Sequence, residues 1–152
     1  IMRDSRIGAY GVLALVGAVL VKAAVLQTAI GFGVWTAALS LVAAAAAART
    51  VALYPWVGLP PARADGLAVS VGRPTVASFR TAMILGLLVT GLAVAWWAPL
   101  GFLVAGVAAA AAARFTASLA EAKIGGHTGD VIGATIVVAD LAYLIALTLW
   151  TV

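Results

Sequence analysis

Long uncharged stretches are the feature that most limits what this chain can fold into. Several segments run for about 20 residues with almost no charged side chain, the length that a helix needs to cross the hydrocarbon core of a bilayer. Only 9% of the residues are charged, whereas a soluble domain has roughly a quarter. Because so few charges cannot cover a water-facing surface, we predict an all-α polytopic membrane protein, a bundle of about five transmembrane helices with cytoplasmic loops.

Glycines and prolines mark the expected ends of these spans. A short turn around residues 27–33 separates the first span from the second, and Pro99 separates the third from the fourth. Prolines between residues 54 and 80 confine that segment to a loop or to short interfacial structure. The expected spans are 7–26, 30–53, 81–97, 100–113 with helix continuing toward 122, and 131–150.

Lysine and arginine lie mainly in alternate connections between the spans, and the turns at 27–31 and 98–99 contain neither. By the positive-inside rule, the side of the membrane that holds the basic connections is cytoplasmic. We therefore expect a multi-pass protein of the bacterial inner membrane, with its active face toward the cytoplasm and its C-terminus outside. The residues on the expected cytoplasmic side are Arg3, Arg6, Arg49, Arg63, Arg73, Arg80, Arg114 and Lys123.

Two charged residues fall deep inside expected spans, away from their ends. Asp140 lies about 15 Å of helix rise beyond Asp130, a depth at which a carboxylate must face the bundle interior, be protonated or pair with a cation. Lys22 and Arg49 are the available partners, although Lys22 could instead extend to the outer boundary. We favour a structural ion pair over a catalytic role for Asp140.

The polar stretch GGHTGD at residues 125–130 leads directly into the last span. Backbone N–H groups at Gly125, Gly126 and Gly129, next to a helix start, favour phosphate binding. Asp130 could hold a divalent cation that bridges phosphate oxygens. His127 could donate to a phosphate or act as an acid or base. The alternative is structural, in which Thr128 or Asp130 only caps the helix and the glycines only form a turn.

A second polar cluster, RDSR at residues 3–6, precedes the first span on the same expected side. Its arginines could anchor lipid headgroups, but the cluster is more polar than anchoring requires. The chain contains no cysteine, so oxygen ligands and a hard cation such as Mg²⁺ are the remaining options for a metal site.

Two motifs together resemble the cobalamin synthase family, the adenosylcobinamide-GDP ribazoletransferases. The sequence IMRDSRIGAYGV at residues 1–12 is similar to the central motif of that family, and GGHTGDVIGA at 125–134 is similar to its C-terminal motif. The segment ARADGL at 62–67 resembles a family loop, and Lys22 and Arg49 also match. The resemblance covers nearly the whole chain.

The chain departs from the family pattern in its acidic residues. Family members carry an upstream half with an acidic motif of the type DGxADxxDG, the expected main Mg²⁺ site, and residues 65–70 only begin in that way. A glutamate common in the last span of the family is Asp140 here. We therefore expect residues 1–152 to form a single transmembrane domain, the C-terminal part of a longer chain.

The resemblance implies a phosphoryl-group transfer, in which the phosphocobinamide group of adenosylcobinamide-GDP passes to α-ribazole or its 5′-phosphate and GMP is released. It implies that Arg3 and Arg6 bind the diphosphate, and that Asp4 and Asp130 bind Mg²⁺ or orient the nucleophile. His127 completes the expected catalytic group with Asp4 and Asp130. The other expected phosphate or substrate contacts are Ser5, Arg63, Arg73, Gly125, Gly126, Thr128 and Gly129.

Two other functions fit the sequence less well than this one. A phosphotransferase of the CDP-alcohol type needs aspartates at DxxDGxxAR spacing, which the chain lacks. A transport or assembly subunit predicts polar residues near the midplane at broken helices, whereas most polar residues here lie on one expected face. The bilayer is an expected partner, nucleic acid is not, and a homo-oligomer remains open.

Overall fold

The computed structural model describes residues 8–62 and 72–151, and these residues are almost entirely helical. Five of the helical segments are long and apolar enough to cross a membrane, with α2 and α3 together counted as one segment. The chain is therefore a multi-pass membrane protein, as its sequence predicts. The helices are α1 (Ala9–Gly31), α2 (Val34–Val51), α3 (Leu53–Gly58), α5 (Val76–Val94), α6 (Pro99–Ile124) and α7 (Gly129–Thr151).

The first turn lies later in the chain than the sequence indicated. Residues 27–31 belong to α1, and the direction changes only at Phe32 and Gly33. Gly33 has a φ of 126°, which a residue with a Cβ rarely adopts, so the chain can reverse there. The prediction that the turn begins near residue 27 is wrong because Gln27 and Thr28 are compatible with helix; the Thr28 hydroxyl donates to the carbonyl of Ala24.

The segment 54–80, expected to be a loop or short interfacial structure, contains the short helix α3 and ends earlier than predicted. Pro55 is accommodated in the first turn of the short helix α3, where its missing N–H costs little. Helix α5 begins at Val76, five residues before the predicted start of its span, because the Thr75 side chain accepts a hydrogen bond from the backbone N–H of Ser78. The predicted continuation of the fourth span is confirmed, since α6 extends to Ile124.

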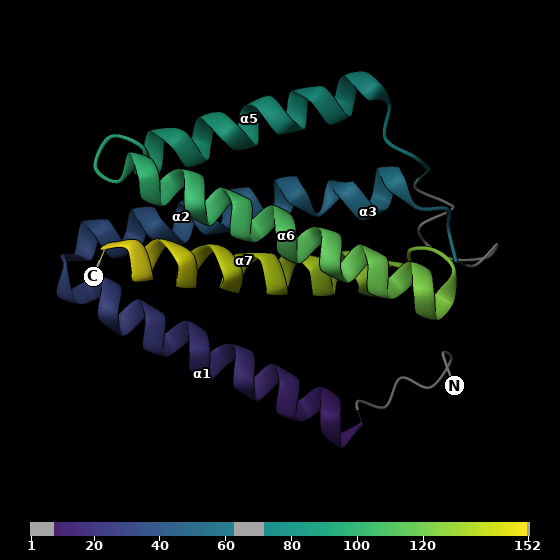
Figure 1. Ribbon diagram of the computed structural model, residues 1–152, viewed down its shortest axis with the longest axis horizontal. Helices are drawn as coiled ribbons and strands as arrows, with labels where there is room; N and C mark the ends of the chain where they lie inside the picture. The colour runs from purple at the N-terminus through teal and green to yellow at the C-terminus, as the bar shows by residue number, and fades with distance from the viewer. Residues whose placement is uncertain (1–7, 63–71, 152) are drawn as a thin grey trace.

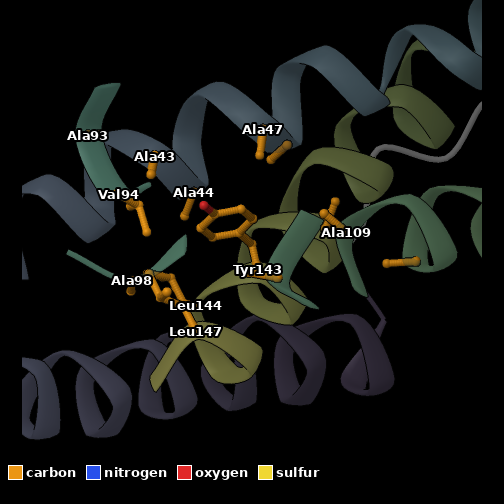
Figure 2. Close-up of a cluster of buried hydrophobic side chains, with 14 residues drawn as sticks. Ala43, Ala44, Ala47, Ala93, Val94, Ala98, Ala109, Tyr143, Leu144 and Leu147 are labelled. Atoms are coloured by element: carbon orange, nitrogen blue, oxygen red, sulfur yellow. The ribbon is translucent and has the colours of Figure 1, made fainter. Parts of the chain in front are cut away.

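Helix α7 occupies the centre of the bundle, with α6 and α2 packed along it, α5 against α2, and α1 on the outside (Figure 1). The core is built largely from alanines, and small side chains let helices approach closely where no hydrophobic driving force acts between them. Tyr143 is the largest fully buried side chain, and Figure 2 shows it projecting from α7 toward Ala44 and Ala47 of α2.

The connections of the bundle fall at two opposite ends (Figure 1). The end of α3, the start of α5 and the α6–α7 connection lie at one end, here called the polar end. The α1–α2 turn and the α5–α6 turn lie at the other end. Since the described connections with lysine or arginine are at the polar end, the charge asymmetry of the sequence corresponds to a real asymmetry of the bundle.

Candidate functional site

The GGHTGD stretch begins as the C-terminal cap of α6. Gly125 has a left-handed conformation with a φ of 69°, and its backbone N–H donates to the carbonyl of Glu121 at 2.9 Å. This is a common way to end a helix, and it favours glycine because a Cβ is strained at positive φ. The Gly125 N–H group is therefore engaged in capping, while the chain turns sharply toward the segment that follows α3.

The next two residues dock on that segment. The backbone N–H of His127 donates to the carbonyl of Pro60 at 2.8 Å, and the N–H of Ala62 donates to the carbonyl of His127 at 2.9 Å. A Cβ on Gly126 would lie 2.3 Å from the Pro60 carbonyl oxygen. Only glycine permits this approach, so the glycine pair is explained by a turn and by a close backbone contact.

The end of the stretch starts the last helix. The hydroxyl of Thr128 accepts a hydrogen bond from the backbone N–H of Val131 at 3.3 Å, which makes Thr128 the cap of α7. The alternative in which Thr128 caps the last helix is therefore confirmed. Asp130 lies in the first turn of α7 and is exposed, at the end of the helix whose dipole favours negative charge.

His127 is buried, with only 3% of its surface exposed. Its Nδ1 lies 3.1 Å from the backbone carbonyl oxygen of Leu59. Because a carbonyl oxygen can only accept, Nδ1 carries the proton in this contact. Nε2 is also buried and has no hydrogen-bond partner within residues 8–62 and 72–151.

A cavity of about 350 Å³ lies beside this ring. Two contacts hold the segment at 72–73 against α3 along its wall: the indole N–H of Trp56 donates to the carbonyl of Gly72 at 3.1 Å, and the guanidinium of Arg73 donates to the carbonyl of Val57. The residues that line the cavity are Trp56, Leu59, Pro60, Pro61, Gly72, Arg73 and His127.

Several expected site residues fall outside the described part of the chain. They are Arg3, Asp4, Ser5, Arg6 and Arg63. Within the described ranges, the structure brings the GGHTGD loop together with Trp56, Pro60–Ala62 and Arg73 at the polar end. No group of three or more metal-binding side chains of the His, Cys, Asp or Glu type occurs among the residues that the structure describes.

The charged pair inside the bundle is distant from this loop along α7. Lys22 of α1 donates to the carboxylate of Asp140 at 2.6 Å, with 43% of the lysine side chain and 12% of the aspartate side chain exposed. Arg49 does not take this role, since its guanidinium donates to the carbonyl of Ala45 in its own helix. The prediction that Asp140 pairs with a cation is confirmed, and the partner is Lys22.

The comparisons with known proteins agree with this picture of the chain. The sequence model for cobalamin-5-phosphate synthase matches residues 1–148, which include both polar motifs. The chain belongs to the cobalamin-5-phosphate synthase family. The matched range includes the GGHTGD loop and the lining of the pocket beside it, which together are the candidate site.

Individual relatives of the family are similar over almost all of the chain. A Rhizobium etli protein named adenosylcobinamide-GDP ribazoletransferase is 40% identical over 151 residues, which is 97% of this chain and 57% of the relative. A protein of the same name from Azorhizobium caulinodans is 38% identical over 152 residues, covering 99% of this chain and 57% of the relative. The chain thus spans less than two thirds of the length of these relatives. No solved structure matches it.

Trp56, Leu59 and Pro60 belong to the site but were not identified from the sequence. They lie in a segment that the prolines predicted only to be irregular, and Leu59 is 68 residues from its hydrogen-bond partner His127. The adjacent prolines at 60–61 were a usable signal, because they leave carbonyl oxygens without neighbouring N–H donors and such oxygens accept bonds from another segment.

Proposed function

We propose that this chain forms part of an adenosylcobinamide-GDP ribazoletransferase. The family match over residues 1–148 carries this proposal, because it includes both polar motifs to which we assign the phosphoryl transfer. The relatives of that name are longer than this chain, so the full activity is proposed for the protein together with any flanking sequence that its gene encodes. The proposed location is the bacterial inner membrane, with the polar end facing the cytoplasm.

The proposed reaction exchanges one phosphorus–oxygen bond for another. A ribose hydroxyl of α-ribazole or its 5′-phosphate attacks the phosphorus atom that carries cobinamide. The bond from that phosphorus to the bridging oxygen breaks, GMP leaves, and the hydroxyl proton passes to a base or to solvent. Such reactions depend on positioning and on compensation of charge on the phosphoryl oxygens, and less on covalent chemistry by the protein.

Mg²⁺ is the cation that this chemistry favours, and Asp130 is a suitable ligand for it. Magnesium ions in phosphoryl-transfer sites are often held by one or two carboxylates plus substrate phosphates, with water completing the shell. Asp130 is exposed at the start of α7, where its carboxylate can reach a phosphate-bound ion. When bound, the ion would neutralise charge on the diphosphate; Asp4 is the proposed second carboxylate.

The remaining proposed contacts are cationic or involve backbone groups. Arg3 and Arg6 are proposed to bind the diphosphate, with Ser5 and Arg63 as further contacts. Gly129 lies at the exposed start of α7, where backbone N–H groups and the helix dipole favour a phosphate oxygen. Gly126 has a more structural place, because its lack of a side chain permits the contact with Pro60.

A turnover assay tests the proposal directly. The protein, purified with any flanking sequence and placed in nanodiscs, would be supplied with adenosylcobinamide-GDP, α-ribazole and Mg²⁺, and GMP release would be measured. We expect Asp130→Asn to lower turnover at least 100-fold, since it removes the charge that holds the ion. The matched control is Glu121→Gln, which neutralises another exposed carboxylate nearby on α6. Equal activity of both variants would rule out the role given to Asp130, and absence of GMP release from the unmodified protein would reject the function.

A further inference from the structure

Two arginines that the proposed reaction does not use, Arg80 of α5 and Arg114 of α6, lie at one level of the bundle. Arg80 precedes the end of α5 at Val94 by 14 residues, and Arg114 follows the start of α6 at Pro99 by 15 residues. The turn that joins these two helices lies at the end opposite the polar end, so both arginines stand about 21–23 Å of helix rise from that end. Both are exposed. Two cations therefore share one depth on successive helices.

Exposed tryptophans show where this depth lies in the bilayer. Trp35 is near the start of α2, Trp96 is in the α5–α6 turn and Trp150 is near the end of α7, so all three lie at the end opposite the polar end. Because tryptophan is enriched at membrane–water interfaces, they mark one boundary of the hydrocarbon core. A core about 30 Å thick then places the other boundary about 7–9 Å beyond the arginine Cα atoms. Arginine side chains extend that far and place their guanidinium groups at the level of the lipid phosphates.

An apolar groove of about 460 Å³ lies between α2, α5 and α6, below the level of these arginines. Figure 1 shows α5 and α6 diverging from the turn that joins them. The side chains along the groove are open to the surroundings: Leu87 of α5 is 62% exposed and Val107 of α6 is 70% exposed. In the part of the chain that the structure describes, no segment covers them. The groove therefore faces the hydrocarbon of the bilayer.

Helical spacing places both arginines on the walls of this groove. Arg80 precedes the lining residues Ile84 and Leu87 by four and seven residues, and residues at these spacings share one helix face. Arg114 follows the lining residue Val107 by seven residues and shares its face in the same way. Both arginines lie on the side of the lining residues that is nearer the polar end. Each wall of the groove therefore ends in a guanidinium group.

Tyr54 of α3 holds one of these groups at the mouth of the groove. It follows the lining residue Thr50 by four residues, and so continues the side of the groove that α2 forms. One guanidinium nitrogen of Arg114 donates to the Tyr54 hydroxyl at 3.2 Å, and the guanidinium carbon lies 5.8 Å from the centre of the ring, within the range of a cation–π contact. A guanidinium has five N–H groups, so others remain for a ligand.

We infer that the groove binds one anionic phospholipid from the leaflet at the polar end, with its phosphate at Arg80 and Arg114 and an acyl chain along the groove. An apolar seat with cations at one end complements a molecule with a negative head and a hydrocarbon tail, and basic pockets between transmembrane helices bind such headgroups. Planar guanidinium groups can bind phosphate oxygens in pairs. An apolar helix would fill the groove but leave both cations without a counter-charge. The inference does not depend on the proposed reaction.

Native mass spectrometry of the purified protein, with any flanking sequence, tests the inference. The protein in detergent is supplied with equal amounts of phosphatidylglycerol and phosphatidylcholine that carry identical acyl chains, and the lipid that stays bound is identified by mass. We expect at least tenfold more phosphatidylglycerol, since each basic side chain near an anionic headgroup contributes about fivefold. Inorganic phosphate, at an ionic strength matched with chloride, should displace none, because it has no acyl chain. Equal retention of the two lipids, or displacement by phosphate, would overturn the inference.

Arginine variants separate the groove from a general attraction of cations to the lipid. Arg80→Gln and Arg114→Gln should each lower the retention of phosphatidylglycerol about fivefold and leave that of phosphatidylcholine unchanged. The matched control is Arg49→Gln. Arg49 lies at the same level, 15 residues from the start of α2, but at least about 100° around that helix from each α2 residue that lines the groove. An equal loss in Arg49→Gln would show that the lipid does not select the groove, and would reject the site.

A glycine of the groove tests the seat of the acyl chain. Gly106 lines the groove, and a Cβ there would have no atom within 4 Å, so Gly106→Leu fills the groove without striking another helix. It should lower the retention of both lipids. Gly17→Leu is the control, because Gly17 also has open space but belongs to α1, which does not line the groove. Unchanged retention in Gly106→Leu would reject the acyl seat. A species of twice the mass that holds no lipid would show that a second copy occupies the groove, and would also overturn the inference.

Discussion

The ion pair between Lys22 and Asp140 should stabilise the bundle mainly by preventing a buried carboxylate from being left alone. At 2.6 Å, two unit charges attract by about 6 kcal/mol when the effective dielectric constant is about 20. Most of this attraction offsets the cost of removing both groups from water, so it is not the net contribution. The unequal exposure of the partners predicts unequal effects of removing each of them.

Lys22→Met keeps the length of the side chain and removes its charge. It leaves the Asp140 carboxylate, which is only 12% exposed, without a cation, and the expected loss is about 3–5 kcal/mol. Asp140→Asn leaves Lys22, whose side chain is 43% exposed and can extend toward water. Its expected loss is smaller, about 1–2 kcal/mol, between the values for buried and surface pairs.

The double variant Lys22→Met/Asp140→Asn decides whether the pair acts as a unit. With both charges absent, no group is left unpaired, and the double variant should be more stable than Lys22→Met alone by about 2 kcal/mol. The free energy of unfolding would be measured in bicelles by denaturant titration. Arg49→Gln is the control, because Arg49 is an exposed cation whose guanidinium donates to Ala45 of its own helix, and it should change stability by about 0.5 kcal/mol or less.

Additive effects in this cycle would refute the reasoning. If the double variant lost the sum of the two single losses, the short distance between Lys22 and Asp140 would carry no coupling free energy. A loss for Asp140→Asn that is larger than the loss for Lys22→Met would show that the lysine, and not the carboxylate, is the group that cannot tolerate isolation.

Three further predictions concern the polar end. Gly126→Ala should destabilise the protein by about 1–3 kcal/mol in thermal unfolding, because the added Cβ would meet the Pro60 carbonyl. The control Gly133→Ala has open space for its Cβ and should be neutral or stabilising. Equal effects of the two variants would contradict the docking of the loop. Thr128→Val should cost about 0.5–2 kcal/mol through loss of the α7 cap, and Thr128→Ser should restore it; no difference between Val and Ser would exclude the cap. Single cysteines at Glu121 and Phe32, placed in a chain without cysteine, should react with an impermeant reagent from the cytoplasmic and outer sides respectively; the reverse pattern would overturn the orientation.

The spans could be predicted from the sequence because they depend on local properties. Length and lack of charge define a transmembrane helix without reference to its neighbours. The errors occurred at span ends, where a specific contact decides the boundary. Thr75 caps α5, and the helix therefore starts at Val76. Gly33 provides the positive φ at which the chain reverses between α1 and α2. The sequence does contain a signal for this cap, because threonine is a preferred N-cap residue and the Thr75 hydroxyl accepts from the N–H three residues later, at Ser78.

The candidate site was only partly predictable for a different reason. The composition of GGHTGD indicates a turn, a helix start and polar chemistry, and these are local properties. The burial of His127 depends instead on Leu59, Pro60 and Ala62, which no local pattern connects to it. The choice of Lys22 over Arg49 as the partner of Asp140 likewise depends on which helix packs against α7.

The Lys22–Asp140 pair joins the two helices that follow the polar motifs in the sequence. Helix α1 follows the RDSR cluster, and α7 follows the GGHTGD loop, so the relative position of the motifs depends on how α1 sits against α7. Helix α1 is the least buried span, and its pair with Asp140 is a polar contact about halfway along both helices. A change in this pair would therefore alter how α1, the helix that follows the RDSR cluster in the sequence, packs against α7. Loss of turnover in a Lys22→Met variant that stays folded under the assay conditions would be the signature of such a positioning role, since the residues that line the cavity beside His127 do not belong to α1.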